Sequence, residues 1–590
     1  MQLWYYYLDQ ILIFAALALS LNLLLGYAGQ VSVAHAAFGA IGGYAMGYLV
    51  TEHGWSFVPS ILFGALLAFV AGVLVSLPAM RLSAEYLILL TLAVSYTIIG
   101  VFVTFPVLGG TYGLIAITRL SFFGWSMRKP SDWIIPSLLL VVFVYAICWR
   151  LGESAFGRVL KGIREDPMAT QALGKNVFSY KVAVFGITSA LAGLAGGMYS
   201  GWLGLATPSV YGFALSLTIF AMVIFGGISN LAGSVLGAAI LTLLEPLLRR
   251  VIKIEASRAA VIRLIIYGLL LAILMRVRAQ GVLPEGRTIG SYFRRGKGEA
   301  RTTMPGEEWR PVATVAISGG READSSEQAR REARWQAAPV VLVTDGVSKS
   351  FGGIVAAEDL HFELRKGTIT ALVGPNGAGK TTVFNLLTGF IRPDRGTVKL
   401  NGGEVVGLNP DKVARLGLVR SFQDVRLFNR VSCLQNVMLA VQHQYGENIA
   451  KLFLGPLAVS KREKEVRDKA MEWLSFVGMA NFAEVPAGAL SYGQTKLVSL
   501  ARVLATDAEV LLLDEPASGI DTHWVDTVLD MIEAVREQGR TVCVVEHNLH
   551  VVGRLADHTY FMELGRITAE GTIDELTNEP RLAEAYFGTG

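Results

Sequence analysis

The feature that most constrains this chain is a series of long apolar runs in its first 280 residues. A helix needs about 20 apolar residues to cross the hydrocarbon core of a bilayer. Charged residues are rare here, and only a few interrupt the first 150 positions. The sequence therefore predicts a polytopic α-helical membrane domain, with nine spans near residues 3–25, 28–51, 57–78, 84–105, 133–150, 178–200, 212–230, 233–248 and 259–278.

Basic residues suggest how these spans are oriented. The stretch from Arg150 to Lys181 also carries Arg158, Lys161, Arg164 and Lys175, and the positive-inside tendency assigns it to the cytoplasm. The N-terminus then faces outward, as a retained first helix rather than a signal peptide. A second basic stretch, residues 249–263, lies outside by the same count. Either a segment within 212–250 is re-entrant or this loop is an exception, and the sequence leaves both open.

Small residues recur at every fourth position in several of these runs, which allows close helix packing in lipid. Two ionisable residues, His35 and Glu85, lie in or beside these runs. Such residues suggest a transport role. The alternatives are a hydrogen-bonded helix contact for His35 and an interfacial position for Glu85. The glycine stripes are Gly39, Gly43 and Gly47, then Gly193, Gly197 and Gly201, then Gly233 and Gly237.

Composition excludes several other classes of protein. The chain has 590 residues and 52% hydrophobic residues, with a mean hydropathy of +0.47, so more than one domain is expected. A net charge of +4 is small for a chain of this length and gives no indication of a nucleic-acid partner. The three cysteines lie far apart without metal-ligand spacing, which argues against a disulfide framework or a zinc site.

The apolar runs stop at about residue 280, and Arg, Glu, Gly and Ser dominate residues 281–339. Too little apolar surface is present there to offset the entropy of ordering. We expect a mostly disordered cytoplasmic tether that keeps the following domain close to its own membrane domain. Part of it, READSSEQARREARWQ, could instead form a surface helix.

Residues 340–590 carry nucleotide-binding chemistry. The strand-like TITALVG leads into a complete phosphate-binding loop, in which glycines let backbone N–H groups point at phosphates and a helix start adds its dipole. Lys380 would reach the β and γ phosphates, and the Thr381 hydroxyl would bind Mg²⁺. The candidate ATP-binding residues of this loop are Gly374, Pro375, Asn376, Gly377, Ala378, Gly379, Lys380, Thr381 and Thr382.

Four further elements follow in a fixed order. Gln423 lies in SFQDVRLF, and Leu490-Ser491-Tyr492-Gly493-Gln494 opens a predicted helix. The strand VLLLDEP then ends in Asp514 and Glu515, and TVCVVEHN ends near His547. A single histidine or acidic pair is usually structural. Five elements in this order make that explanation improbable and predict an ATPase.

The first 280 residues resemble the permease subunits of branched-chain amino acid ABC importers. The resemblance rests on LNLLLGYAGQVSVAHAAFGAIGGYAMG, LPAMRLSAEYLILLTLA and FGRVLKGIREDPMATQALGKNVFSYKVAVFGITSALAGLAGGMY. It implies that a coupling segment near 157–175, including Glu165, Asp166, Ala172 and Gly174, docks on the ATPase. The LGGTYGL stretch departs from the family pattern at Tyr112, which bears on the cargo.

Residues 340–590 resemble the ATPase subunits of the same importers, an α/β P-loop fold with a helical subdomain. The motifs are SFQDVRLFNRVSCLQNVMLAVQH, LSYGQTKLVSLAR and LAEAYFG. The resemblance implies that Asp514 holds Mg²⁺ with Thr381 and Gln423, and that Glu515 polarises the attacking water. It also implies that His547 contacts the γ phosphate and Phe351 stacks on adenine. Ser491, Gly493 and Gln494 would bind nucleotide, although Thr495 and Lys496 depart from the usual signature.

The family resemblance also implies partners. Each ATP lies between the phosphate loop of one ATPase domain and the signature of another. The expected partners are a second ATPase domain, a second permease and a periplasmic binding protein, in a bacterial inner membrane. Branched-chain amino acids are the expected cargo, with urea, short amides or aromatic carboxylates as alternatives. An exporter, or a regulatory ATPase with a membrane anchor, is a different class. Pairing of two copies and pairing with unlike subunits both stay open.

Overall fold

The computed structural model describes residues 2–117, 120–252, 256–277, 280–285, 325–520 and 522–578. It divides into two compact units. The first contains Met1–Arg164 and Val177–Arg301, and the second contains Glu165–Asn176 and Thr302–Gly590. Of the predicted tether, residues 286–324 lie outside the described residues, as do Asp521 and the LAEAYFG ending.

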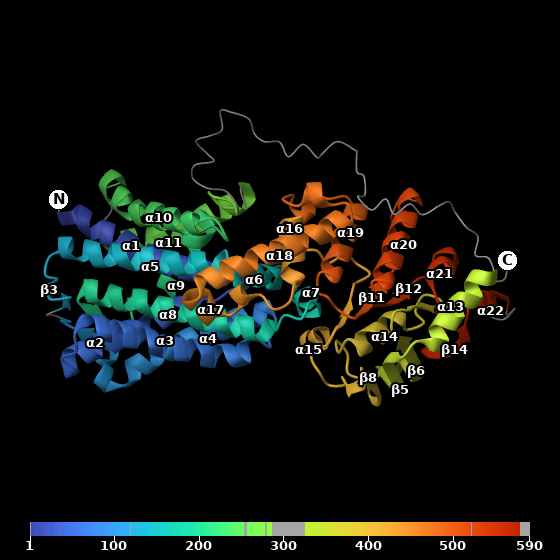
Figure 1. The fold of residues 1–590 in the computed structure, drawn as a ribbon. Helices are drawn as coiled ribbons and strands as arrows, with labels where there is room; N and C mark the ends of the chain where they lie inside the picture. The colour runs from blue at the N-terminus through green and yellow to red at the C-terminus, as the bar shows by residue number, and fades with distance from the viewer. Residues whose placement is uncertain are drawn as a thin grey trace. The chain divides into compact units, whose positions relative to one another are not determined.

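The first unit is helical, and its helices follow the predicted apolar runs (Figure 1). In the described part of the chain, five helices are long and apolar enough to cross a membrane: Leu3–Tyr27, Phe57–Ala79, Glu85–Thr104, Pro130–Gly152 and Val177–Leu203. The helices are α1 Gln2–Asn22, continued by η1 Leu23–Tyr27, then α2 His35–His53, α3 Phe57–Ala79, α4 Ala84–Thr104, α5 Ile134–Gly152, α6 Ala155–Glu165, α8 Val177–Leu203, α9 Phe213–Gly226, α10 Leu231–Ile252 and α11 Ala256–Val277.

Two groups of hydrogen bonds lie at opposite ends of this unit. At one end, Arg164 Nη1 donates to Gly26 O at 2.7 Å and to the Ser229 hydroxyl, while Nη2 lies 3.1 Å from Glu285 Oε2. At the other end, β1 (Leu114–Ile115) pairs with β4 (Leu205–Ala206). The 27 residues of α8 separate these ends by about 40 Å. We call them the Arg164 end and the β4 end.

These ends bear on the question of a re-entrant segment. The chain passes from β4, at one end, through the 14-residue helix α9 to Ser229 at the other. The chain from β4 to Ser229 therefore crosses from one end to the other without turning back, and α9, about 21 Å long, covers about half of that distance. The basic stretch at 249–263 includes residues 253–255, which lie outside the described residues.

Glycines in the first unit allow neighbouring helices to pack closely against one another. A Cβ atom at Gly42 of α2 would lie 1.9 Å from the carbonyl oxygen of Gly193 in α8, and one at Gly196 would lie 2.0 Å from Gly39 O. A Cβ atom at Gly237 of α10 would likewise lie 2.1 Å from Met222 O in α9. Close packing on small residues is thus as expected. Two of its tightest points, Gly42 and Gly196, lie beside the predicted stripes.

The two ionisable residues considered for transport have structural explanations. His35 is buried, and its Nε2 lies 2.7 Å from the Ser20 hydroxyl. Glu85 is exposed and accepts a hydrogen bond from the Ser83 hydroxyl at 2.7 Å. The predicted helix contact therefore describes His35, and the exposure of Glu85 agrees with an interfacial position, which stays a prediction.

The second unit is built around a six-stranded sheet in the order β10-β11-β12-β7-β13-β14. Strands β10, β11, β12, β7 and β13 are parallel, and β14 is antiparallel. Strands β7, β11 and β12 are fully buried, as apolar runs covered on both faces should be. Their bounds are β7 Ile369–Val373, β10 Leu418–Arg420, β11 Val510–Asp514, β12 Thr541–Val545, β13 His558–Glu563 and β14 Arg566–Gly571.

A second sheet and a set of helices complete this unit (Figure 1). The antiparallel sheet β6-β5-β8-β9 consists of β5 Val340–Phe351, β6 Ile354–Arg365, β8 Arg395–Leu400 and β9 Gly403–Glu404. The helices are α7 Pro167–Ala172, α13 Ser325–Ala337, α14 Lys380–Leu387, α15 Pro410–Arg415, α16 Cys433–Ala440, α17 Ile449–Leu454, α18 Pro456–Phe476, α19 Tyr492–Leu504, α20 Thr522–Glu537, α21 Leu549–Leu555 and α22 Ile573–Asn578.

The predicted tether ends in the helix α13, in agreement with the expectation that part of it could form a surface helix. Trp335 is buried and stacks on His558 with ring centroids 4.4 Å apart and an interplanar angle of 4°. Arg334 Nη1 lies 2.9 Å from Asp557 Oδ1, and Arg331 donates to Gly553 O. Helix α13 is therefore packed onto the ATPase fold rather than disordered.

Residues 165–176 also belong to the second unit. Lys175 Nζ lies 2.6 Å from Glu447 Oε1, and Arg426 Nη1 lies 3.1 Å from Asp166 Oδ2. Gln442 Nε2 donates to Leu173 O at 2.8 Å. Together with further contacts, such as Arg415 Nε to Gly174 O at 2.8 Å, these bonds fix the segment through its side chains and its backbone.

Candidate functional site

Four parallel strands of the central sheet end at one edge. The strands β10, β11, β12 and β7 are neighbours in register, so the residues that follow them meet at their carboxyl ends. This edge holds the loop after β7, the end of β11 at Asp514, and the residues after β12 and β10. The predicted motifs, far apart in sequence, are brought together here.

The loop at Gly374–Gly379 adopts a conformation that requires glycine. Gly374, Gly377 and Gly379 have φ angles of +149°, +83° and +108°. A Cβ atom at Gly379 would lie 2.3 Å from Ala356 O, and one at Gly374 would lie 2.0 Å from Met562 O. The loop is thus curled against its neighbours, and it leads into α14 at Lys380. This is the geometry that presents backbone N–H groups to phosphates.

Lys380 lies at the centre of this edge. Its ammonium donates to Gly374 O at 2.7 Å and to Pro375 O at 2.9 Å. Burial lowers the pKa of Lys380, while the negative charges of Glu515 and Asp514 act in the opposite direction. The lysine is therefore held at the phosphate loop and faces the acidic end of β11.

Asp514, at the end of β11, is buried. Its Oδ2 lies 3.4 Å from Arg420 Nη2, and its backbone N–H donates to the Ser421 hydroxyl at 2.9 Å. Burial raises the pKa of Asp514, and the Arg420 charge opposes that shift. Arg420 is itself held by the side-chain oxygen of Asn385 and by the ring of Phe422, 4.6 Å away.

Glu515 has an unusual backbone. Its φ is +47°, a left-handed conformation that costs a non-glycine residue about 1–3 kcal/mol. Its N–H donates to Val545 O at 2.9 Å, and its carbonyl oxygen accepts from Lys496 Nζ at 2.7 Å. The His547 Nδ1 lies 3.6 Å from Glu515 Oε1. The structure thus places Glu515 and His547 side by side, although they are 32 positions apart.

The remaining predicted residues of this edge are accessible. Gln423, after β10, and Thr381, at the start of α14, are exposed, and Thr382 is half-buried. Phe351, at the end of β5, is exposed, and its ring is 5.5 Å from Lys349 Nζ. An exposed aromatic ring at a strand end suits stacking on a base, and this exposure does not match a place in the core of the sheet.

The signature residues lie elsewhere. Ser491 caps α19: its hydroxyl accepts from Gln494 N, and Gln494 Oε1 accepts from Ser491 N at 3.0 Å. Ser491, Gly493 and Gln494 line a hollow of about 330 Å³ with Trp524 of α20. No residue of the phosphate loop lines this hollow in the described part of the chain. The loop and the signature of one chain therefore form two separate sites.

Sequence reasoning missed three residues of this site. Lys496 was noted only as a departure from the signature, yet it holds the Glu515 carbonyl. Arg420 and Glu546 are buried ionisable residues beside the acidic pair, and burial raises the pKa of Glu546. A charged residue at the end of an otherwise apolar strand, as in LVR and VVE, is the signal that could have identified the last two.

Comparison with known proteins supports both halves. The family described as branched-chain amino acid transport system / permease component matches residues 4–275, and the ABC transporter family matches residues 357–518. The high-affinity branched-chain amino acid transport ATP-binding protein BraF of Pseudomonas aeruginosa is 37% identical over 250 residues, which cover 42% of this chain and 98% of the relative.

Two further similarities concern the same region. The corresponding protein LivG of Salmonella typhimurium is 36% identical over 249 residues, covering 42% of this chain and 98% of the relative. A crystal structure of a nucleotide-free ATP-binding cassette from an ABC transporter matches with 30% identity and a TM-score of 0.38, covering 42% of this chain and all of the other. The chain belongs to the branched-chain amino acid ABC transporter family and joins a permease domain and an ATP-hydrolysing domain of that family in one polypeptide.

Proposed function

We propose that this chain is the permease and ATPase half of an importer for branched-chain amino acids, which a periplasmic binding protein delivers. The observation that carries the proposal is the seating of residues 165–176 within the ATPase unit, through Lys175–Glu447 and Asp166–Arg426. A short polar segment between two spans is the coupling loop of an importer, whereas exporters have long helical extensions.

ATP binds at the carboxyl edge of the sheet. The loop amides and Lys380 hold the β and γ phosphates, Phe351 stacks on adenine, and Glu515 polarises the attacking water with His547 at the γ phosphate. Phosphoryl transfer requires such fixed, charge-neutralising groups. The backbone of Glu515, held at both its N–H and its carbonyl, keeps the carboxylate at this position.

The same edge suits Mg²⁺. The candidate ligands Thr381, Gln423 and Asp514 offer only oxygen atoms as a hydroxyl, an amide and a carboxylate, which this ion prefers. Asp514 is already buried beside two cations, Arg420 and Lys380. The ion would neutralise charge on the phosphate oxygens.

The separation of loop and signature requires a sister ATPase domain. Each ATP is then enclosed by the phosphate loop of one domain and the signature of the other, and closure is favoured because ATP binds the closed pair better. A second permease completes the transporter in a bacterial inner membrane. The family resemblance implies unlike pairs of subunits, so we favour separate partners over two copies of this chain.

Uptake by the assembled complex tests the proposal. Reconstituted with its binding protein, the complex should accumulate radiolabelled leucine rather than urea, a short amide or benzoate. Glu515→Gln should bind ATP yet lower turnover about 100- to 10,000-fold, as expected for loss of a general base. Hydrolysis that is indifferent to both cargo and binding protein would instead indicate a regulatory ATPase with a membrane anchor, and stimulation by lipophilic compounds would indicate an exporter.

A further inference from the structure

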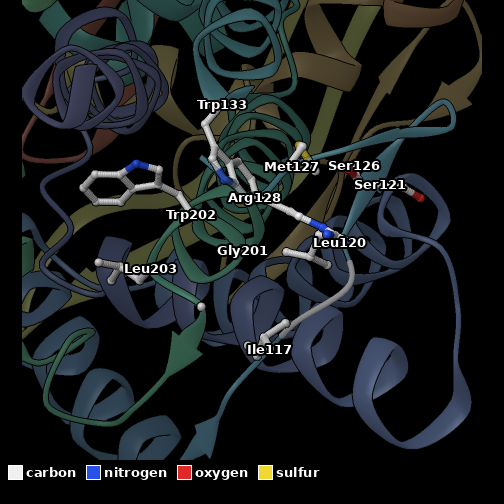
Figure 2. A pocket seen from close by; sticks show the side chains of 11 residues that line it. Ile117, Leu120, Ser121, Ser126, Met127, Arg128, Trp133, Gly201, Trp202 and Leu203 are labelled. Atoms are coloured by element: carbon white, nitrogen blue, oxygen red, sulfur yellow. The ribbon is translucent and has the colours of Figure 1, made fainter. Parts of the chain in front are cut away.

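A cavity of about 590 Å³ lies at the β4 end of the first unit (Figure 2). Ile117, described residues between 120 and 133, and the last turn of α8 form it. Backbone hydrogen bonds hold these parts together, from Ile117 N to Gly204 O at 2.9 Å and from Met127 N to Leu120 O at 3.0 Å. The volume has room for about 20 waters at about 30 Å³ each, and pockets of this size take small organic ligands.

The cavity contains one cation and no acid among its described lining residues. That cation is Arg128, whose side chain crosses the view in Figure 2 between Trp202 and the two serines, Ser121 and Ser126. The acidic residue nearest in sequence is already engaged, because Asp132 Oδ2 accepts from the backbone N–H groups of Arg128 and Lys129 at 3.0 and 2.9 Å. In the described part of the chain, no carboxylate pairs with the Arg128 guanidinium.

Polar and apolar groups contribute about equally to the walls of the cavity, and the apolar part includes two indole rings that are fixed in place. Trp133 is buried and packs edge-on against Phe57, with centroids 5.7 Å apart. Trp202 packs on Tyr6 at 4.5 Å and on Tyr199 at 5.9 Å. Rings held by their neighbours lose little freedom when a ligand binds, which favours affinity.

We infer that this cavity receives a small carboxylate with an apolar body at the outer entrance of the permease. An arginine fork binds a carboxylate through two parallel hydrogen bonds, and the indole and aliphatic walls accept the hydrocarbon part. The inference rests on the proposed function and deepens it. It assigns a cargo class, carboxylates, and excludes urea and short amides, which offer Arg128 no anion.

The position of the cavity agrees with this role. The opposite end of this unit holds Arg164, which lies in the basic stretch from Arg150 to Lys181 that the positive-inside tendency assigns to the cytoplasm. The β4 end is therefore the end at which cargo arrives from outside. The loop from 105 to 133 is external by the predicted topology as well.

A binding experiment on the complete chain tests the inference. The chain is purified in lipid nanodiscs without nucleotide or binding protein, and calorimetry measures binding of leucine, isovalerate, isovaleramide and urea. Isovalerate and isovaleramide share one apolar body and differ in the carboxylate. Leucine and isovalerate should bind, and the two neutral compounds should not. Arg128→Gln should weaken carboxylate binding about 10- to 100-fold, as for a lost charged hydrogen bond.

Two further variants serve as controls. Lys129→Gln removes the same charge from the adjacent position, which does not line the cavity, and should bind like the wild type. Arg128→Lys keeps the charge but not the fork and should lose less than Arg128→Gln. Equal binding of isovalerate and isovaleramide, or unchanged binding by Arg128→Gln, overturns the inference.

The outcomes separate this inference from the proposed function. If Arg128→Gln binds isovalerate as the wild type does and its complex still takes up leucine, the inference is overturned while the proposed function stands. Uptake of urea in place of leucine would overturn the proposed cargo. If Arg128→Gln impairs only stimulation by the binding protein, the guanidinium contacts an acidic side chain of that partner, and the small-carboxylate site is wrong.

Discussion

Glycines in the two halves of this chain serve different physical needs. In the ATPase, Gly374 and Gly379 have positive φ angles, so their function is inherent in the local backbone. In the permease, Gly42 and Gly196 lie in ordinary helices, and only the neighbouring helix, about 2 Å from the absent Cβ, demands them. A local need appears as a motif whose glycines are individually required, whereas a stripe of small residues indicates close packing but does not show which glycines the neighbouring helix requires.

The largest expected effect is in the phosphate loop. Gly379→Ala places a side chain in a left-handed conformation and 2.3 Å from Ala356 O, so the loop must open. ATP affinity should fall about 100-fold or more, measured by titration with a fluorescent nucleotide. Gly402→Ala is the matched control, because it has φ +77° but open space around its Cβ. Equal affinities of the two variants would contradict the distinction.

The helix contact offers a matched pair of its own. Gly42→Ala should destabilise the permease by about 2–3 kcal/mol, the cost of overpacking, because its Cβ would meet the Gly193 carbonyl at 1.9 Å. Gly39→Ala, whose Cβ would be 3.5 Å from Ala192 O, should cost well under about 1 kcal/mol.

Thermal unfolding measures this difference. The reaction of the buried Cys148 thiol with a fluorescent dye reports opening of the permease, in a background where Cys433 and Cys543 are alanine. A glycine requirement set by the partner helix predicts a lower melting temperature for Gly42→Ala alone. Similar melting temperatures for both variants would show that the stripe tolerates side chains throughout.

The smallest expected effect concerns His558, the β13 residue on which Trp335 of α13 stacks. This contact involves neither a positive φ angle nor a glycine between two helices. Burial lowers the pKa of His558 to about 4, below its usual 6.5. The folded chain therefore holds this ring neutral, and the unfolded chain takes up the proton first. The stabilisation is complete above about pH 6.5 and is lost as the pH falls toward 4.

Melting temperatures at pH 7.5 and 5 check this expectation. His558→Gln should reduce the difference between the two temperatures, while His361→Gln, at an exposed position, should leave it unchanged. A pH dependence that survives His558→Gln would assign it to other groups.

The sequence predicted the features that depend on local contacts and missed those that depend on contacts between distant residues. The helical membrane domain and the P-loop fold were predictable, because apolar runs and motifs are continuous in the chain. The meeting of Lys380, Asp514 and His547 was expected from the order of the motifs along the chain and from the family resemblance. Arg128 could not be assigned, since its cavity exists only where a loop meets the last turn of α8. Lys496 was missed because its partner is a backbone carbonyl 19 positions away.

The docking of α13 sets where the fused polypeptide can be divided. Asp557 accepts from Arg334 through one oxygen and from the Ile369 N–H through the other, at 2.9 and 2.8 Å. Tension on the tether would thus reach the first residue of the strand that supplies the phosphate loop. A gene split into separate subunits must leave Ser325–Ala337 with the ATPase, and a protease site for releasing that subunit belongs upstream of Ser325.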